Sequence, residues 1–275
     1  MLNSTKSRNT GKIAIIKLSG KSINDFISSD KWVTAIKKLQ DQYGGVIIVH
    51  GAGKTITEWA EKMGISSVFV EGHRVTTSDM MEIVSAVQGG LVNTKLSAKL
   101  NSSGIRALGL SGIDKNTFTA KYLDKNIGFV GRPEIKGSAD WIKELLQKKV
   151  IPVFSSICCD EEGNLMNVNA DLFTEVLAAA LKAEIVFFVS DVNGVILDNE
   201  IKEYLTPDDI IAGINSNQIT GGMIPKLKSC SGLLDQGVHK IWIGSDLISY
   251  LNGFSDHGTC IVKSHKVKRA KLKVA

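Results

Sequence analysis

The sequence has little of the material from which metal centres, disulfide frameworks and membrane spans are built. Only four cysteines and five histidines occur in 275 residues. The cysteines (Cys158, Cys159, Cys230 and Cys260) lack zinc-ligand spacing, so we expect free thiols in a reducing cytoplasm and no protein metal site. The longest apolar runs have strand length, and residues 1–12 lack the apolar core of a secretory signal. These absences favour a globular cytoplasmic protein.

The positive charge of the chain is concentrated at its C-terminus. Residues 263–275 contain six Lys or Arg and no acid, and without them 27 basic residues face 28 acidic ones. A body of nearly neutral charge, with no aromatic residues among its scattered cations, predicts neither a nucleic-acid partner nor a membrane partner. The basic segment is either a solvated terminus or a contact for an acidic partner.

The most distinctive stretch is Val46–Thr55, where a β-branched run meets a glycine turn and a helical pattern begins. Such a turn predicts an anion site, because glycine lets backbone N–H groups face a ligand and the helix N-terminus adds positive charge. Gly53-Lys54-Thr55 matches the end of a P-loop, but Ile48 occupies the position of the first P-loop glycine. Ile56 likewise replaces the third glycine of a dinucleotide fingerprint. This stretch alone therefore does not identify which anion is bound.

Apolar strand patterns alternate with amphipathic helical patterns along the chain. Strands are expected at 13–18, 46–50, 105–110, 150–154, 184–191, 240–243 and 259–262, helices at 30–42, 55–63, 80–100, 139–148, 172–182 and about 223–236, and hairpins at 67–76 and 115–131. This order predicts a single α/β domain over residues 1–275, with an open, mainly parallel central sheet between helices and with β-hairpin insertions. The unbroken apolar runs 13–18 and 105–110 indicate strands buried on both faces.

Three cations occupy positions at which an anionic ligand is expected. Lys17 ends the first strand, and open parallel sheets bind ligands at the carboxyl ends of their strands. Arg74 is a candidate carboxylate clamp, since a guanidinium group matches a carboxylate bidentately. Lys226 follows the glycine turn 220–222 by about one helical turn, where it can reach a phosphate at the helix N-terminus.

Short polar side chains also occur at the start of one expected helix and at the end of one expected strand. Asn167, Asn169 and Asp171 lie at the start of one helix and exceed what a single cap requires, although capping and an Asx turn remain the alternative. Asp191 ends a strand, where it suits a ribose hydroxyl or a helix cap equally well.

Six motifs, in order, resemble the amino acid kinase family. They are Lys17–Gly20, His50–Gly53, Gly72–Thr76, Met166–Asp171, Ser190–Val195 and Gly222–Lys226. The similarity extends from about residue 12 to 262, and within the family it is closest to the kinases of N-acetyl-L-glutamate. The resemblance implies an N-terminal lobe (about 12–180) for the acylamino acid and the phosphate loops, and a C-terminal lobe (about 181–262) for the nucleotide.

The resemblance also implies roles for individual residues. Lys17 and Lys226 would stabilise the transferring phosphoryl group, and Asp171 would orient them. Substrate-binding positions would be Ala52, Gly53, Arg74, Asn167 and Asn169, and nucleotide-binding positions Gly20, Asp191, Val192, Asn193, Gly194, Val195, Ile196, Gln218, Ile219 and Thr220. ATP would be the cosubstrate and would carry Mg²⁺ with it. A homodimer is expected, because the N-terminal stretch is short compared with that of hexameric, arginine-inhibited members.

The implied activity is ATP-dependent phosphorylation of the γ-carboxylate of N-acetyl-L-glutamate in arginine biosynthesis. Two alternatives stay open: a sibling kinase for N-succinylglutamate or carrier-bound aminoadipate, and a nucleotide-binding regulator that has lost catalysis. The regulator is suggested by Ser19 and Ala52, which stand where the family usually has glycine. If the loop required a positive φ, Ala52 would cost about 1 kcal/mol.

Overall fold

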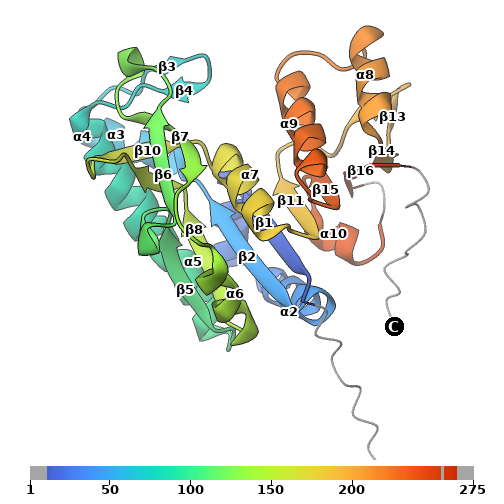
Figure 1. Ribbon diagram of the computed structural model, residues 1–275, viewed down its shortest axis with the longest axis horizontal. Coiled ribbons are helices and arrows are strands. Elements are labelled where there is room, and N and C mark those ends of the chain that lie inside the picture. The colour runs from blue at the N-terminus through green and yellow to red at the C-terminus, as the bar shows by residue number, and fades with distance from the viewer. Residues whose placement is uncertain (1–10, 255–256, 265–275) are drawn as a thin grey trace, which may run out of the picture.

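The computed structural model describes residues 11–254 and 257–264, and its centre is an eight-stranded sheet that runs through the whole molecule (Figure 1). The spatial order is β14-β16-β15-β11-β1-β2-β8-β5. These strands are β1 (Ile13–Leu18), β2 (Gly45–His50), β5 (Ala107–Ser111), β8 (Ile151–Ser155), β11 (Ile185–Val189), β14 (Tyr204–Leu205), β15 (Lys240–Gly244) and β16 (Thr259–Val262). All neighbours pair in parallel except β15 and β16. The predicted α/β fold with a mainly parallel sheet is confirmed.

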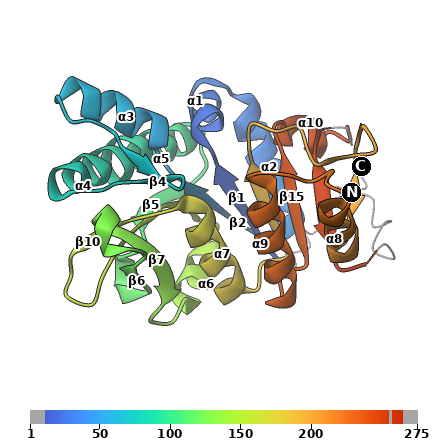
Figure 2. The same ribbon diagram turned by 90° about the horizontal axis from the view of Figure 1, so that it is seen from above.

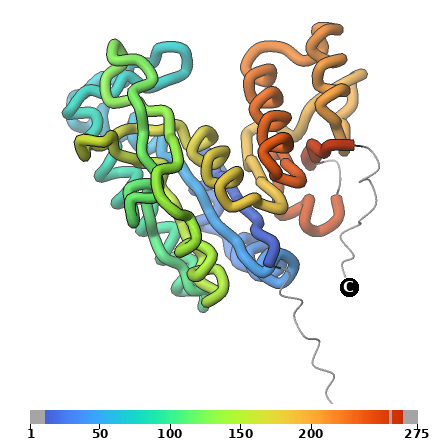
Figure 3. Tube along the Cα trace, in the orientation of Figure 1, coloured from blue at the N-terminus to red at the C-terminus, as the bar shows by residue number. Residues whose placement is uncertain are grey.

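The chain starts in the middle of the sheet and builds outward in two directions. β1 pairs with β2 on one side and with β11 on the other, so that Lys17 lies opposite both Val49 and Phe188. The tube view shows the earlier part of the chain, blue to green, on one side and the orange and red C-terminal part on the other (Figure 3). A reversal of strand order of this kind is the usual place for a ligand at the carboxyl ends of the strands.

Helices cover both faces of the sheet (Figure 2). They are α1 (Gly20–Ser28), α2 (Lys31–Tyr43), α3 (Gly53–Lys62), α4 (Ser78–Val84), α5 (Asn93–Ser102), α6 (Asp140–Gln147), α7 (Ala170–Leu181), α8 (Pro207–Asn215), α9 (Met223–Asp235) and α10 (Leu247–Leu251), with a π-helix η1 (Ser85–Val92) and short 3₁₀ turns η2 (Asp114–Asn116) and η3 (Lys125–Ile127). Ile15 of β1 belongs to the core beneath α7, and Ile16 belongs to the core beneath α1 and α2. This alternation divides the apolar interior into two layers.

Short strands are added outside the main sheet. A four-stranded sheet, ordered β6-β7-β10-β9, consists of β6 (Phe118–Tyr122), β7 (Val130–Ile135), β9 (Ile157–Cys159) and β10 (Leu165–Val168). Two-stranded hairpins are formed by β3 (Phe69–Val70) with β4 (His73–Arg74) and by β12 (Ile196–Leu197) with β13 (Glu200–Ile201). The expected hairpins at 67–76 and 115–131 are confirmed, and the second extends to Ile135.

One of two further expectations about these elements was wrong. The run 105–110 is not a strand buried on both faces, because β5 is an edge strand that pairs only with β8. Leu108 on this strand is 44% exposed, and an unbroken apolar run does not by itself distinguish a central strand from an edge strand. The helix expected at 80–100 is confirmed, since α4, η1 and α5 follow one another without a break over 78–102; the middle segment η1 is a π-helix, a kind often found near functional sites.

Several features bear on the expected compartment and partners. All four cysteines are free thiols, and no helix in the described part of the chain is long and apolar enough to cross a membrane. Residues 1–10 and most of the basic segment 263–275 lie outside the described residues. The expectations about a signal sequence and about an acidic partner concern these residues, so they lie outside the described part of the chain.

Candidate active site

Two helix N-termini lie side by side at the carboxyl edge of the sheet. α1 begins at Gly20 directly after β1, and α3 begins at Gly53 directly after β2, whose strand ends are paired at Leu18 and His50. In α3 no described side chain accepts a hydrogen bond from the first-turn N–H groups, whereas in α1 Ser19 and Ser22 form a capping box that engages one of them; neither first turn contains an acid. Unsatisfied N–H groups and two helix dipoles therefore converge on one place, which favours an anion.

Each of these helices also has a lysine as its second residue. The helix dipole disfavours a cation there, so Lys21 and Lys54 do not help to stabilise their helices. The side chain of Lys54 is 73% exposed, and its contact with Glu58 is long, at 4.0 Å. Its Cβ lies 3.9 Å from the place that a Cβ on Gly20 would occupy. The two lysines strengthen the positive potential of this edge.

Serine and alanine fit the two positions at which the family usually has glycine. Ser19 has a φ of −95° and Ala52 a φ of −152°, and residues with side chains adopt negative φ values without strain. The left-handed cost considered for Ala52 therefore does not arise. The N–H of Ser19 donates to Ser22 Oγ at 2.9 Å, so at these two positions only the N–H of Ala52 is offered to an anion.

Asp171 brings two distant lysines together. Its Oδ1 lies 2.6 Å from Lys17 Nζ at the end of β1, and its Oδ2 lies 4.0 Å from Lys226 Nζ in α9. Asp171 is in the first turn of α7, which lies beside α9 on the same face of the sheet (Figure 2). Burial would raise the pKa of Asp171, but Lys17 and Lys226 outweigh burial and hold that pKa below its usual range. One carboxylate thus holds two ammonium groups, and one positive charge remains in excess.

Arg74 is a buried cation without an acidic partner in the described part of the chain. It is 7% exposed, and burial lowers its pKa. Its guanidinium group donates to Ser67 Oγ at 2.5 Å and to Gly53 O and Thr57 Oγ1 at 2.8 Å each, and it lies 4.7 Å from the centre of the Phe69 ring. These acceptors are neutral, so the charge is uncompensated until an anion binds beside it.

A cavity of about 230 Å³ connects these groups. Its walls include Lys17, Gly51, Ala52, Gly53, Phe69, His73, Arg74, Gln88, Ser156, Asn167, Asn169 and Asp171. Asn167 donates to Thr76 Oγ1 at 3.0 Å, which fixes its amide at the cavity wall. Asn169 caps α7 by accepting a hydrogen bond from Asp171 N at 2.7 Å. Asn169 is therefore a helix cap, as the alternative interpretation had it, whereas the carboxylate of Asp171 contacts the two lysines.

The sequence analysis missed the network that supports the glycine turn. His50 is fully buried, and burial lowers its pKa to about 4 despite the hydrogen bond to Gly51 O, so its ring is neutral. Its Nδ1–H donates to Gly51 O at 3.0 Å, and its Nε2 accepts from Asn93 Nδ2 at 3.0 Å. The amide of Asn93 fits because a Cβ on Gly109 would overlap Asn93 Oδ1. Of these residues, only His50, directly before the glycine turn, carried a sequence signal.

The segments expected to bind the nucleotide lie in the C-terminal part, and some of their side chains are already engaged. Val195 and Ile219 are buried, so only their backbone groups are available for a ligand. Gln218 accepts a hydrogen bond from Asp198 N at 2.6 Å, which joins the β12–β13 hairpin to the turn before α9. Asp191 is exposed and precedes β12 rather than a helix, so the capping alternative for it was wrong.

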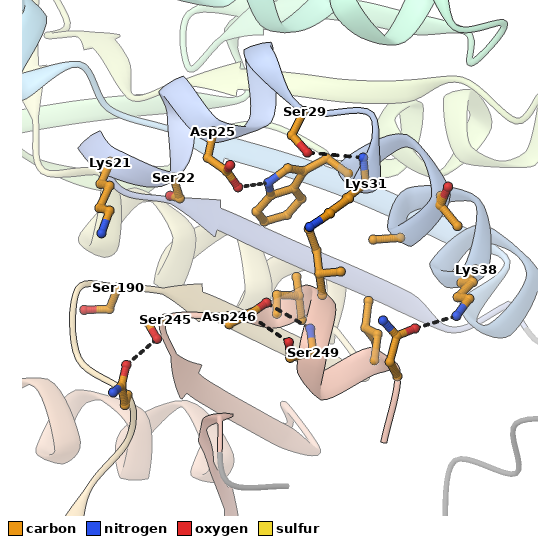
Figure 4. A pocket seen from close by; sticks show the side chains of 18 of the residues that line it. Lys21, Ser22, Asp25, Ser29, Lys31, Lys38, Ser190, Ser245, Asp246 and Ser249 are labelled. Carbon is orange, nitrogen blue, oxygen red and sulfur yellow. Dashed lines mark hydrogen bonds between the residues drawn. The ribbon is translucent and has the colours of Figure 1, made fainter. Parts of the chain in front are cut away.

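A second, larger cavity of about 740 Å³ lies between α1 and α2 on one side and the ends of β11 and β15 with α10 on the other (Figure 4). Its wall is about equally polar and apolar and includes Lys21, Asp191 and Asn193. Several of its groups are paired internally, as in the hydrogen bond of 2.7 Å from Lys38 Nζ to Asn252 Oδ1. Lys17, Arg74 and the glycine turn before α3 line the smaller cavity, whereas the first turn of α1 lines the larger one. The smaller cavity is therefore the candidate site of chemistry.

The described residues contain no group of three or more His, Cys, Asp or Glu side chains arranged to hold a metal ion. The charged groups of the smaller cavity are predominantly cationic. Such a site suits an anionic ligand that brings its own metal better than a metal bound by the protein.

The profile of the amino acid kinase family matches residues 12–245. The chain belongs to the amino acid kinase family. The acetylglutamate kinase of Geobacillus sp. (strain WCH70) is 34% identical over 252 residues, which cover 91% of this chain and 97% of that protein. The acetylglutamate kinase of Bacillus licheniformis is 35% identical over 254 residues, which cover 92% and 97%. The family resemblance inferred from six motifs is confirmed.

Solved structures agree with the amino acid kinase fold. The crystal structure of smu.665 from Streptococcus mutans UA159 has a TM-score of 0.76 at 31% identity, covering 92% of this chain and all of that chain. The carbamate kinase of Giardia lamblia bound to AMP-PNP has a TM-score of 0.65 at 15% identity, covering 93% and all of that chain, and this likeness concerns the fold alone. The chain is a kinase-type transferase of a family that uses ATP.

Proposed function

We propose that this protein transfers the γ-phosphoryl group of ATP to the γ-carboxylate of N-acetyl-L-glutamate, forming N-acetyl-L-glutamyl 5-phosphate in cytoplasmic arginine biosynthesis. The observation that carries the proposal is the contact of Asp171 with both Lys17 and Lys226 beside the N-termini of α1 and α3. The substrate is suggested by relatives named acetylglutamate kinase at about 34% identity.

The chemistry of the proposed step matches the groups present. The attacking carboxylate is already ionised, so no general base is needed. Phosphoryl transfer depends mainly on positioning and on neutralising the charge of the phosphoryl oxygens. Lys17 and Lys226 would contact these oxygens from opposite sides, and the N–H groups of the turns at Gly20 and Gly53 would add hydrogen bonds. Mg²⁺ would enter with the nucleotide.

The acceptor would lie in the smaller cavity. The uncompensated guanidinium group of Arg74 suits the α-carboxylate of an acylamino acid, and the fixed amide of Asn167 would bind the same molecule. Arg74 donates to Gly53 O, so acceptor binding would be coupled to the turn that holds the phosphate. The other positions assigned to acceptor and nucleotide in the sequence analysis remain proposals.

Two alternatives are weaker. A sibling kinase for N-succinylglutamate or carrier-bound aminoadipate would use the same lysines, and the basic segment that could contact a carrier lies mainly outside the described residues. A regulator without catalysis would have no need of both Lys17 and Lys226, and the unstrained backbone at Ser19 and Ala52 removes its main support. We also keep the homodimer and the two-lobe division at about residue 180 as proposals.

The test is an ADP-release assay with ATP, Mg²⁺ and a panel of acceptors. N-Acetyl-L-glutamate should give the highest kcat/KM, above N-succinylglutamate, free glutamate and N-acetylaspartate. Turnover with another acceptor and none with N-acetylglutamate would reject the proposed substrate but retain the kinase. Light scattering on the same sample should give the mass of two chains.

A further inference from the structure

Gln88 is a buried polar side chain of which the folded chain uses only one end. It belongs to the π-helix η1, is 3% exposed and lines the smaller cavity. Its Nε2 donates to Ser156 Oγ at 2.9 Å, and Ser156 Oγ donates to Val168 O at 2.7 Å. No described residue donates to its Oε1, and this oxygen is not sealed in the interior, so it opens on the cavity that Gln88 lines.

Ser156 fixes which end of the Gln88 amide faces the cavity. The hydroxyl hydrogen of Ser156 is given to Val168 O, so Ser156 Oγ can only accept from Gln88. Turning the amide over would place two acceptors, Oε1 and Oγ, against each other. The next residue supports this arrangement, because a Cβ on Gly89 would lie only 3.1 Å from Ile157 Cδ1, and its absence lets η1 approach β9. The oxygen of Gln88 is therefore held toward the cavity.

A structural role does not account for this oxygen. The bond to Ser156 needs only the amide nitrogen, and a carbonyl oxygen that is withdrawn from bulk water without a donor is costly. Methionine has nearly the same length as glutamine and would fill the same space without that cost. The amide oxygen therefore calls for a donor that arrives with a ligand.

The surroundings of Gln88 identify the donor by its chemistry. The hydrogen-bonded chain from Gln88 ends at Val168, directly after Asn167, which the proposed function places against the acceptor substrate. Among the described residues that line this cavity, Asp171 is the single carboxylate, and two lysines hold it. An ammonium group would find no anionic partner on the wall and would face the uncompensated charge of Arg74. A neutral amide N–H meets both conditions.

We propose that Gln88 Oε1 accepts a hydrogen bond from the amide N–H of the acylamino acid, and that Gln88 thereby selects acceptors with an acylated nitrogen. This inference rests on the proposed function, which places the acylamino acid in the smaller cavity beside Arg74 and Asn167. Asn167 is partly exposed, so water can reach its amide oxygen, whereas Gln88 is buried and depends on the ligand for a donor. Gln88 is thus a specificity-determining residue that does not touch the reacting γ-carboxylate.

The experiment compares N-acetyl-L-glutamate with its ester analogue, α-acetoxyglutarate of the same configuration, in which an oxygen atom replaces the amide N–H. In the wild type, kcat/KM for the ester should be at least about 30-fold lower, because the ester places an acceptor against Oε1. In Gln88→Met the two acceptors should come within about fivefold of each other, with the change mainly in KM. Gln147→Met makes the same exchange at the exposed end of α6 and should keep the wild-type ratio.

The amide-to-ester ratio of the wild type tests the inference without any variant. Equal use of both acceptors by the wild type would overturn the inference and leave the proposed kinase intact. A loss of turnover in Gln88→Met that is the same for both acceptors would show a purely structural link to Ser156 and would also overturn it. If Gln88→Met does not fold, Gln88→Leu supplies the comparison. If the wild type phosphorylates neither acceptor, the proposed function fails and the inference fails with it.

Discussion

Asp171 Oδ1 lies 2.6 Å from Lys17 Nζ although more than half of the chain separates the two residues in sequence. The second carboxylate oxygen, Oδ2, lies 4.0 Å from Nζ of Lys226, which belongs to α9 in the C-terminal part of the chain. This one carboxylate holds two cations close together against their mutual repulsion. The predictions below follow from that arrangement and from the groups that support it.

Removing either lysine should affect turnover far more than nucleotide binding. Lys17→Met and Lys226→Met should each lower kcat at least about 100-fold, because each removes a cation that acts on the transferring group. Nucleotide affinity, measured by titration calorimetry, should change by less than about tenfold. Lys143→Met is the control, since Lys143 is exposed on α6 and pairs with Asp140 at 2.9 Å, and it should keep at least about a third of wild-type kcat. Equal losses in all three variants would contradict the assigned roles.

Asp171→Asn should leave two lysines without the anion that holds them. We expect kcat to fall about 100-fold and the variant to be less stable, because two nearby cations then repel each other. In the wild type the pKa of Asp171 is lower when folded than when unfolded. Its contribution to stability is therefore present above the unfolded carboxyl pKa and is lost as the pH falls through the lower, folded pKa. Urea unfolding from pH 7 to 3 should show this acid-dependent loss in the wild type and less of it in Asp171→Asn.

His50 predicts a second pH effect in a different range. Its folded pKa of about 4 lies below the unfolded value, so the unfolded chain binds the proton first as the pH falls. Stability from neutral His50 is complete above about pH 6.5 and decreases as the pH drops toward 4, by roughly 3 kcal/mol in total. Unfolding free energies at pH 7.5 and 5 should differ less in His50→Gln than in the wild type. The same pH dependence in both proteins would exclude His50 as the cause.

Arg74→Lys should act on the acceptor and not on the nucleotide. Lysine keeps the charge but loses the planar fork that also bonds to Ser67, Gly53 and Thr57. KM for N-acetylglutamate should rise at least about tenfold, while KM for Mg·ATP stays within about threefold. Steady-state kinetics with each substrate varied in turn measures the split. A larger effect on ATP would move Arg74 out of the acceptor site.

Gly109→Ala should disrupt the support of the glycine turn from a distance. The added Cβ would overlap Asn93 Oδ1 and force the amide away from His50, at a cost of about 2–4 kcal/mol. Gly90→Ala is the matched control in the adjacent helical segment, because a Cβ there meets nothing within 4 Å. Thermal unfolding should show a lower Tm for Gly109→Ala and an unchanged or higher Tm for Gly90→Ala. A normal Tm for Gly109→Ala would mean that the Asn93 amide is not held as described.

The sequence predicted what depends on local pattern. Apolar periodicity predicts the limits of β1, and turn residues predict the hairpin that carries Arg74 and the polar start of α7. The contact of Lys17 with Asp171 depended on the family resemblance, because no local pattern shows which distant strand end meets another. The fit of Asn93 to Gly109 is a packing relation between whole elements, and it became visible only in three dimensions.

The central claim is that this site makes an acyl phosphate on a carboxylate. Hydroxylamine traps such a product as a hydroxamate, so the decisive measurement is hydroxamate formation from ATP, Mg²⁺ and N-acetyl-L-glutamate. The account predicts hydroxamate in equal amount to the ADP released, with both lost together in Lys17→Met and Asp171→Asn. ADP release that does not depend on the acceptor, or that yields no hydroxamate, would contradict it.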